Sequence, residues 1–320
     1  MKRDVVSQID PASWPVIPRG TSFEEHTVGR VFDHHWGRTI HASDNIDFTT
    51  QTLAFNPIYF NRDAALAAGH QDEVVNPMLV FSVVFGLSVE DLSEAGGPFL
   101  GGTNVEYLRD VYPGETLTAS STVVEARESS SRPGVGIVTW DTVGRDSLGE
   151  PVIRFRRTNL ANKRDDSREI SPVLEGYAED FVVGARFRHS RTRTITDLDL
   201  NGLTLNVMNT AVGHFSEQYM ADSPFGGRIN FGGLTLSLTI GLATQDVSGQ
   251  AVREVGMDDI AFPAPVKHGD SIGAATEVVA VEPDGEGLAV VSLRHYGVNQ
   301  RGEIVCQATR KIQVRTRPQA

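Results

Sequence analysis

The residue best suited to chemistry is His214, which lies in segment 205–215, shortly before an apolar stretch that begins at Phe231. An imidazole can take up or release a proton near neutral pH, so it suits general acid–base catalysis. Gly232 and Gly233 open the apolar stretch. If that stretch is a helix, the glycines allow close approach to the backbone, and the first N–H groups can bind a developing negative charge. This combination predicts proton transfer next to a carbonyl group.

The basic residues suggest two places where an anion could bind. Arg228 is the cation closest in sequence to His214 and could pair with a carboxylate of a ligand. A denser group could contact phosphates or could simply be solvated on a strand and a linker. It consists of Arg154, Arg156, Arg157, Lys163 and Arg164.

The chain carries one sequence pattern twice, at an offset of 155 positions. The matching segments are Arg38-Thr39-Ile40 with Arg193-Thr194-Ile195, Gly86-Leu87 with Gly241-Leu242, and Gly114-Glu115 with Gly269-Asp270. A constant register over most of the chain predicts two copies of one domain. Asp44 and Asp199 occur in both copies, which favours a turn or capping role over catalysis. At the same offset Tyr59 aligns with His214, so only the second copy has the imidazole.

The elements that must position these residues follow the same order in both copies. Each copy has an early strand, an irregular segment, an apolar helix and a run of strands rich in Thr, Val and Ile. The irregular segment of the first copy predicts a short helix with Asn56 as its N-cap, Pro57 in its first turn and Gly69 as its stop. The apolar helices are expected at 77–89 and 231–244, and the later strands at 115–126, 136–144, 151–160, 272–281, 287–297 and 303–314.

These elements predict an α+β protein in which each of two antiparallel sheets wraps around one buried helix, the sheets pairing as a pseudo-dimer. We expect an N-terminal extension at 1–22, domain 1 at 23–160, a linker at 161–180, domain 2 at 181–316 and a tail at 317–320.

Composition excludes several classes of partner. The 320 residues include 29 Lys and Arg against 41 Asp and Glu, a formal charge of −12, which argues against nucleic acid. No apolar stretch is long enough to span a membrane, and the start lacks the apolar core of a signal peptide, so we expect a cytoplasmic protein. Cys306 is the single cysteine, which excludes an intrachain disulfide and a cysteine-rich metal site.

Two motifs carry a resemblance to a known family. Asn209-Thr210-Ala211-Val212-Gly213-His214 and its counterpart Ala54-Phe55-Asn56-Pro57-Ile58-Tyr59 are similar to Asp-x-Asn-Pro-x-His, and the segment 262–270 ends in a Pro-x-x-x-Gly-Asp signature. Over about Phe23 to Val314 the chain resembles the MaoC-like dehydratases in their tandem, double hot-dog form. It looks most like the branch of mesaconyl-CoA hydratase, or β-methylmalyl-CoA dehydratase.

The resemblance implies reversible addition of water to a 2-enoyl-CoA, in which the substrate carries coenzyme A and neither a metal nor another cofactor takes part. His214 would move the proton, and Asn209 would hold the water through its carbonyl oxygen and amide. The amides around Gly232 and Gly233 would bind the thioester oxygen. The acyl group could be branched or dicarboxylic, and a dicarboxylic one such as mesaconyl would need a cation near the acyl end. Arg228 is the first candidate for that cation, followed by Arg62 and Arg109. Asn56 and Tyr59 would line the equivalent half-site of the first copy, which has lost the catalytic residue types and could admit a substrate tail or the coenzyme. Neutral sequence drift explains the same residues equally well.

Two alternatives stay open at this point, along with a possible homodimer of double hot-dogs. An acyl-CoA thioesterase on the same fold would need an acidic residue near the buried helix. Segment 231–244 has none, and Glu90 and Asp91 lie at the far end of the other helix. A catalytically inactive CoA-thioester-binding subunit is the non-enzymatic alternative.

Overall fold

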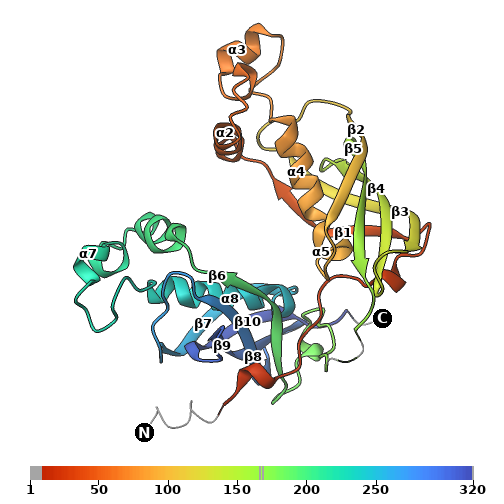
Figure 1. Cartoon of the computed structure of the whole chain (residues 1–320). Coiled ribbons are helices and arrows are strands. Elements are labelled where there is room, and N and C mark those ends of the chain that lie inside the picture. The colour runs from red at the N-terminus through yellow and green to blue at the C-terminus, as the bar shows by residue number, and fades with distance from the viewer. Residues whose placement is uncertain (1–8, 166, 168, 319–320) are drawn as a thin grey trace. The chain divides into compact units, whose positions relative to one another are not determined.

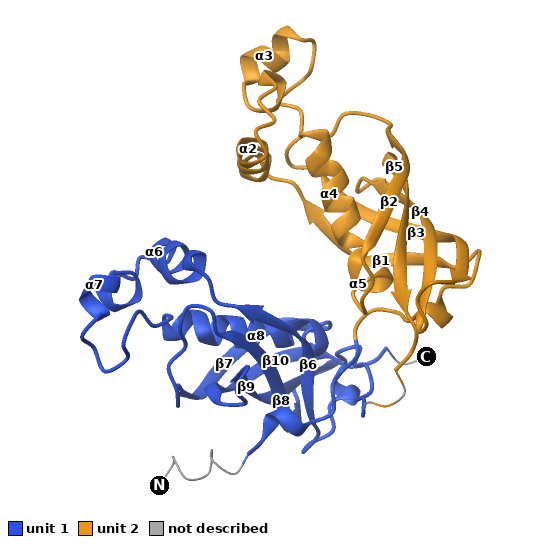
Figure 2. Cartoon of the chain, viewed as in Figure 1, with its two compact units in different colours: residues 1–18, 168–320 blue, residues 19–167 orange. Residues whose placement is uncertain are grey.

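The computed structural model describes residues 9–165, 167 and 169–318, and it divides into two compact units (Figure 2). One unit contains the first copy, residues 19–167 (orange), and the other contains the second copy, residues 168–320 together with 1–18 (blue). Residues of the expected N-terminal extension therefore belong to both units.

The first-copy unit is one antiparallel sheet with helices packed against it. Its strands have the order β1-β3-β4-β5-β2. In chain order its elements are η2 (Phe23–Glu25), β1 (Val31–Thr39), α2 (Ala42–Gln51), η3 (Pro57–Tyr59), α3 (Arg62–Ala67), α4 (Pro77–Leu87), α5 (Val89–Leu92), β2 (Phe99–Tyr107), β3 (Thr116–Glu128), β4 (Val135–Arg145) and β5 (Pro151–Asn162).

The second-copy unit repeats this arrangement, with the strand order β6-β8-β9-β10-β7. Its elements are η1 (Pro11–Ser13), η4 (Ala178–Asp180), β6 (Arg186–Thr194), the π-helix η5 (Leu198–Leu203), α6 (Thr204–Asn206), η6 (Val212–His214), α7 (Glu217–Met220), α8 (Gly232–Val247), β7 (Ala251–Ala261), β8 (Ser271–Pro283), β9 (Leu288–Asn299) and β10 (Ile304–Arg315). Figure 1 shows α4 and α8 each lying along the sheet of its own unit. The prediction of two antiparallel sheets, each around one apolar helix, is confirmed.

The two copies also share unusual backbone conformations at equivalent positions. Leu53 and Met208 both adopt a positive φ, 59° and 58°, and so do Asn104 and Asp259, with 54° and 53°. Each pair stands at the offset of 155. Non-glycine residues rarely adopt this conformation, so its recurrence supports a duplicated domain.

Each apolar helix is buried on one side. Leu79, Val80, Val83, Val84 and Leu87 of α4 pack against β3 and β5 and against Ile40, which follows β1, in the largest core cluster of their unit. On the opposite side Met78, Ser82 and Gly86 are exposed, as are Ser237, Gly241 and Thr244 of α8. Enclosure by the sheet within one unit is therefore one-sided.

Two details differ from the sequence-based expectation. The short helix expected from Asn56 to Gly69 is interrupted: η3 ends at Tyr59, and Asn61 caps a new start by accepting a hydrogen bond from the N–H of Ala64. The edge strands β2 and β7 were not expected, because their residues show no alternation of apolar and polar side chains and nearly all are exposed.

A His–Asp–hydroxyl network ties a helix to the sheet in both units, through Asp246 of α8 in the second copy and through Asp91 of α5, the short helix after α4, in the first. His189 of β6 contacts Asp246 of α8 through Nδ1 at 2.5 Å and Thr276 of β8 through Nε2 at 2.7 Å. His34, Asp91 and Ser121 form the same arrangement in the first copy, with distances of 2.6 and 2.9 Å. All three pairs stand at the offset of 155, so the network belongs to the domain architecture.

No helix within the described residues is long and apolar enough to cross a lipid bilayer. The same residues hold no group of three or more His, Cys, Asp or Glu side chains placed to bind a metal ion.

Candidate active site

His214 ends the single 3-10 turn η6 and is half-buried. Its Nδ1 lies 2.9 Å from the carbonyl oxygen of Ile229. A carbonyl oxygen only accepts hydrogen bonds, so Nδ1 carries the proton and the neutral ring has its lone pair on Nε2. No described residue hydrogen-bonds to Nε2. The ring is therefore oriented with its basic nitrogen open.

The first copy uses the equivalent carbonyl differently. Val74 aligns with Ile229, and its carbonyl oxygen accepts a hydrogen bond of 3.1 Å from the side-chain amide of the buried Asn45. Tyr59, the counterpart of His214, also ends a single 3-10 turn. The backbone frame is thus shared, and the imidazole that can transfer a proton is specific to the second copy.

The starts of the two central helices differ in the same way. In the first copy Asn76 caps α4, its Oδ1 accepting a hydrogen bond of 3.0 Å from the N–H of Met78, and Pro77 has no N–H. In the second copy Phe231 stands in the place of Asn76 and makes no side-chain cap. Gly232 and Gly233 replace Pro77 and Met78.

Both glycine amides of α8 therefore remain as donors, because the first N–H groups of a helix have no partner within it. No described side chain accepts a hydrogen bond from either of them. Two unpaired amides at a helix start can stabilise a developing oxyanion. Only the helix start in the copy that has His214 offers them.

The glycines also have a packing reason. A Cβ at Gly232 would lie 3.1 Å from the ring of Phe262, and a Cβ at Gly233 would lie 2.5 Å from the ring of Phe231. The ring of Phe231 in turn lies 5.6 Å from that of His214, centroid to centroid. The ring of Phe231 thus packs beside both the imidazole and the first residues of α8.

Comparisons with known sequences identify the family of the chain. The family model of mesaconyl-CoA hydratase matches residues 15–171 and again residues 168–316. The chain belongs to the mesaconyl-CoA hydratase family. A mesaconyl-CoA hydratase of Haloarcula hispanica is 33% identical over 313 residues, which cover 88% of this chain and 87% of that protein.

Two more distant matches also extend over most of the chain. A β-methylmalyl-CoA dehydratase of Chloroflexus aurantiacus is 25% identical over 292 residues, 82% of either chain. Among solved structures, a MaoC domain protein dehydratase from the same organism has 22% identity, covers 93% of this chain and 98% of its own, and gives a TM-score of 0.44.

Asn209, which stands in the family motif, supports the turn before His214. Its side-chain oxygen accepts a hydrogen bond of 3.0 Å from the N–H of Ala211, whose carbonyl oxygen accepts one of 3.1 Å from the N–H of His214. The oxygen is therefore engaged, and the amide nitrogen is the group that could hold water. That role stays a prediction.

Arg228 is held by the segments around it. Its guanidinium donates to Glu217 at 2.5 Å, to Asp197 at 2.9 Å and to Asn201 at 3.2 Å. The hydrogen bond to Glu217, followed by that to Asp197, raises its pKa above the ordinary value. Binding of a substrate carboxylate by Arg228 stays a prediction, and it would require exchange of a carboxylate already present.

In the first copy, Asn56 and Tyr59 lie on the corresponding turn. The side chain of Asn56 accepts a hydrogen bond from the N–H of Ile58 at 3.4 Å, which confirms it as an N-cap. The carbonyl oxygen of Tyr59 accepts one of 2.7 Å from Asn45. Their expected contact with substrate stays a prediction.

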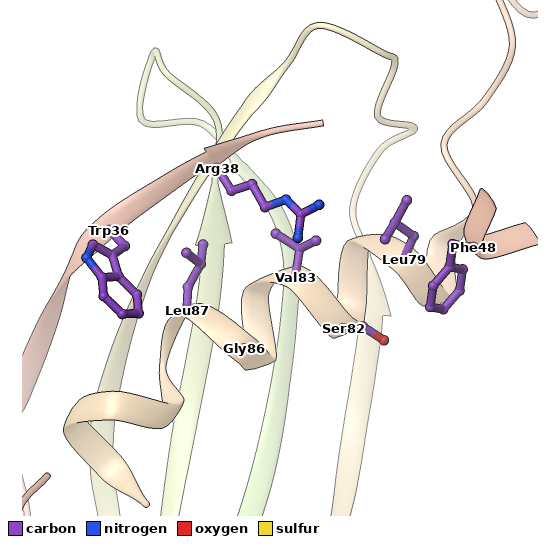
Figure 3. Close-up of a pocket in the computed structure, with 8 residues that line it drawn as sticks. All are labelled: Trp36, Arg38, Phe48, Leu79, Ser82, Val83, Gly86 and Leu87. Atoms are coloured by element: carbon purple, nitrogen blue, oxygen red, sulfur yellow. The ribbon is translucent and has the colours of Figure 1, made fainter. Parts of the chain in front are cut away.

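The first copy also holds a cavity of about 370 Å³ along α4 (Figure 3). Its lining is mainly apolar: Trp36, Arg38, Phe48, Leu79, Ser82, Val83, Gly86 and Leu87. Arg38 projects from β1 over Val83, and its guanidinium pairs with Asp44 at 3.1 Å. Arg193 and Asp199 form the same pair in the second copy at 2.6 Å, so this ion pair is structural.

Most of the dense basic group is neutralised within its own unit. Arg154 pairs with Glu106, Arg156 with Asp141 and Lys163 with Glu128. Arg157 is buried, with its guanidinium 4.3 Å from the centre of the Phe85 ring. Burial lowers the pKa of Arg157 to about 10. These contacts favour the solvated-strand interpretation for the paired side chains.

Sequence reasoning missed two features of the site, the carbonyl of Ile229 and the absent cap at Phe231. The second could have been found, because the offset of 155 aligns Phe231 and Gly232 with Asn76 and Pro77. The first involves a backbone atom 15 residues beyond His214, which no side-chain pattern announces.

Proposed function

We propose that this chain is a hydro-lyase that reversibly adds water to the double bond of a 2-enoyl-CoA thioester. The names of its relatives, mesaconyl-CoA hydratase and β-methylmalyl-CoA dehydratase, support a branched, dicarboxylic acyl group. The observation that carries the proposal is the pairing, in the second copy alone, of an imidazole with open Nε2 and a helix start with two unpaired amides.

In the proposed reaction Nε2 of His214 removes a proton from water as the water oxygen bonds to C3 of the enoyl group. The C2=C3 electron pair moves toward the thioester, and the amides of Gly232 and Gly233 hold the resulting enolate oxygen. The imidazolium then returns a proton to C2. One water is consumed, its hydroxyl on C3 and a hydrogen on C2, with no change of oxidation state overall.

Asn209 and Arg228 have supporting roles in this proposal. The amide nitrogen of Asn209 donates to the water while its oxygen keeps the turn. Arg228 joins α7 and the π-helix η5 through Glu217 and Asn201, which fixes the segments on either side of His214. Asn209 thus contacts the reacting water without supplying a base, whereas Arg228 has a positioning role.

The experiment follows the enoyl-thioester absorbance and free thiol together, with crotonyl-CoA and mesaconyl-CoA as substrates. Hydration lowers the absorbance without releasing thiol. Release of thiol would identify a thioesterase, and binding without either change would identify an inactive binding subunit. Either of those two results would refute the proposal.

A further inference from the structure

The second copy contains an exposed lysine, Lys267, on a segment that pairs through the backbone with Ile229, and no described carboxylate forms an ion pair with it. Within segments 197–234 and 262–270, which surround His214, the only Lys or Arg residues are Arg228 and Lys267. Arg228 is paired with Asp197 and Glu217. Lys267 forms no ion pair with any described residue.

The backbone places Lys267 against the segment that orients the imidazole. Lys267 forms an antiparallel bridge with Ile229. Ile229 accepts the hydrogen bond of His214 through its carbonyl oxygen, and its N–H donates to the carbonyl of Gly213 at 3.4 Å. Next to the bridge, the N–H of Asn230 donates to the carbonyl of Val266 at 2.7 Å. This isolated bridge thus joins the Lys267 segment to the residue that hydrogen-bonds with both Gly213 and His214.

The turn that carries Lys267 is fixed, while its ammonium group keeps donors to spare. The N–H of Lys267 donates to the carboxylate of Asp270 at 3.0 Å, and Arg301 binds that carboxylate at 2.8 Å. Nζ donates to the carbonyl oxygen of Phe225. An ammonium has three donors, so this bond leaves two for a ligand.

The first copy shows that the turn does not require the lysine. Tyr112 aligns with Lys267, and its N–H donates to Glu115 at 2.8 Å in the same turn. The backbone arrangement is therefore common to both copies, whereas the ammonium group occurs only in the copy with the imidazole and the open helix start.

We propose that Lys267 is a specificity-determining residue that binds the free carboxylate of a dicarboxylic enoyl-CoA in the His214 site. This proposal rests on the function proposed above and adds that the site prefers substrates with a second, negatively charged carboxylate. A substrate carboxylate can bind the ammonium group of Lys267 directly, because no other carboxylate occupies it. At Arg228 the substrate would first have to displace Asp197 or Glu217.

The test compares two thioesters that differ in this carboxylate alone. Mesaconyl-CoA with its thioester on C1 is compared with (E)-2-methylcrotonyl-CoA, which has a methyl group in place of the free carboxylate. We expect Lys267→Met to lower kcat/KM for mesaconyl-CoA about 10- to 100-fold, mainly through KM, the usual effect of losing a hydrogen bond to a charged group. The methylcrotonyl thioester should change less than about 3-fold, and Lys267→Arg should keep the preference.

Lys311→Met is the matched control, because Lys311 lies in the same unit and pairs with Asp258 on the β10–β7 edge at 3.3 Å. Lys311→Met should leave kcat/KM unchanged for both thioesters. Equal losses with both thioesters in Lys267→Met would assign Lys267 to holding the Phe225 loop and would overturn the proposal. An unchanged preference would overturn it as well.

Dissociation constants of both thioesters, measured by calorimetry, test the role of Lys267 independently of whether the chain catalyses hydration. If the parent chain hydrates neither thioester, the proposed function fails. The ratio of the two dissociation constants in the parent and in Lys267→Met then decides the role of Lys267: a ratio that falls about 10-fold or more supports it, and an unchanged ratio refutes it.

Discussion

Nδ1 of His214 donates a hydrogen bond of 2.9 Å to the carbonyl oxygen of Ile229. This contact fixes the proton on one ring nitrogen and leaves the other as the base, which is the arrangement that general base catalysis requires. The equivalent carbonyl in the first copy, that of Val74, is bound by Asn45 instead. One backbone position is thus used to orient a base in one copy and to hold a turn in the other.

The amide of Gly232 should contribute directly to catalysis. Gly232→Pro removes this N–H, as Pro77 does in the first copy, and proline is tolerated at the first position of a helix. Loss of one oxyanion donor should lower kcat about 10²- to 10³-fold. Steady-state kinetics with mesaconyl-CoA measure the effect.

Gly232→Ala is the control for this variant, because it brings the same Cβ toward the ring of Phe262 and keeps the N–H. It should retain most of the activity that Gly232→Pro loses. Equal rates in the two variants would mean that this amide binds no oxyanion.

The duplicated His–Asp–hydroxyl network should stabilise both units. His189→Ala removes a hydrogen-bond partner from Asp246 and from Thr276, all within a buried region. We expect a loss of about 2–4 kcal/mol in the free energy of unfolding of the second-copy unit.

His34→Ala should destabilise the first-copy unit in the same way but by less, because the side chain of Asp91 is 30% exposed and that of Asp246 only 3%. Urea unfolding of both variants, with proteolysis to tell which unit opens, measures this. A change below about 0.5 kcal/mol in both would show that the network is not structural.

Acid should destabilise the first-copy unit through His26. Burial, followed by the charge of Arg30, lowers the pKa of His26 to about 4. Between pH 6.5 and 4 the unfolded chain binds a proton that the folded one does not, so stability falls as the pH falls through this range. The loss at pH 5 relative to pH 7 should be about 2 kcal/mol.

The His26→Phe variant should lack this part of the pH dependence, since it has no proton to bind. Urea unfolding is followed by the fluorescence of Trp36 and Trp140, in a Trp14→Phe background that silences the other unit. Parallel pH profiles of the variant and its parent would contradict the assignment.

The single thiol should be unreactive in the folded chain. Cys306 is fully buried, and burial raises its pKa to about 11. The thiolate fraction at pH 8 is then about 100-fold below that of an ordinary cysteine. Ellman's reagent should react slowly with the native chain and rapidly in concentrated guanidinium, and fast native labelling would show that Cys306 is accessible.

Much of this fold could be predicted because the sequence contains two copies of the same domain. The constant offset located both domains and the imidazole, and alternation in Thr, Val and Ile located β3, β4 and β5 with their counterparts. The edge strands escaped prediction because strands such as β2, with Gly101 and Gly102, have no buried face to impose a pattern.

The site was harder to predict than the fold because it depends on backbone groups and on competition between charges. Arg228 is adjacent in sequence, but only the folded chain shows that Asp197 and Glu217 already neutralise it. Lys267 lies 39 positions beyond Arg228, and the bridge to Ile229 is what brings its backbone to the segment that orients His214.

The central claim is tested most directly by the rate at which His214→Ala hydrates mesaconyl-CoA, compared with the parent chain and with His268→Ala, an exposed imidazole on the Lys267 turn. Loss of the only proposed base should lower kcat about 10²- to 10⁴-fold, while His268→Ala should keep the parental rate. Hydration by His214→Ala at the parental rate would contradict the account.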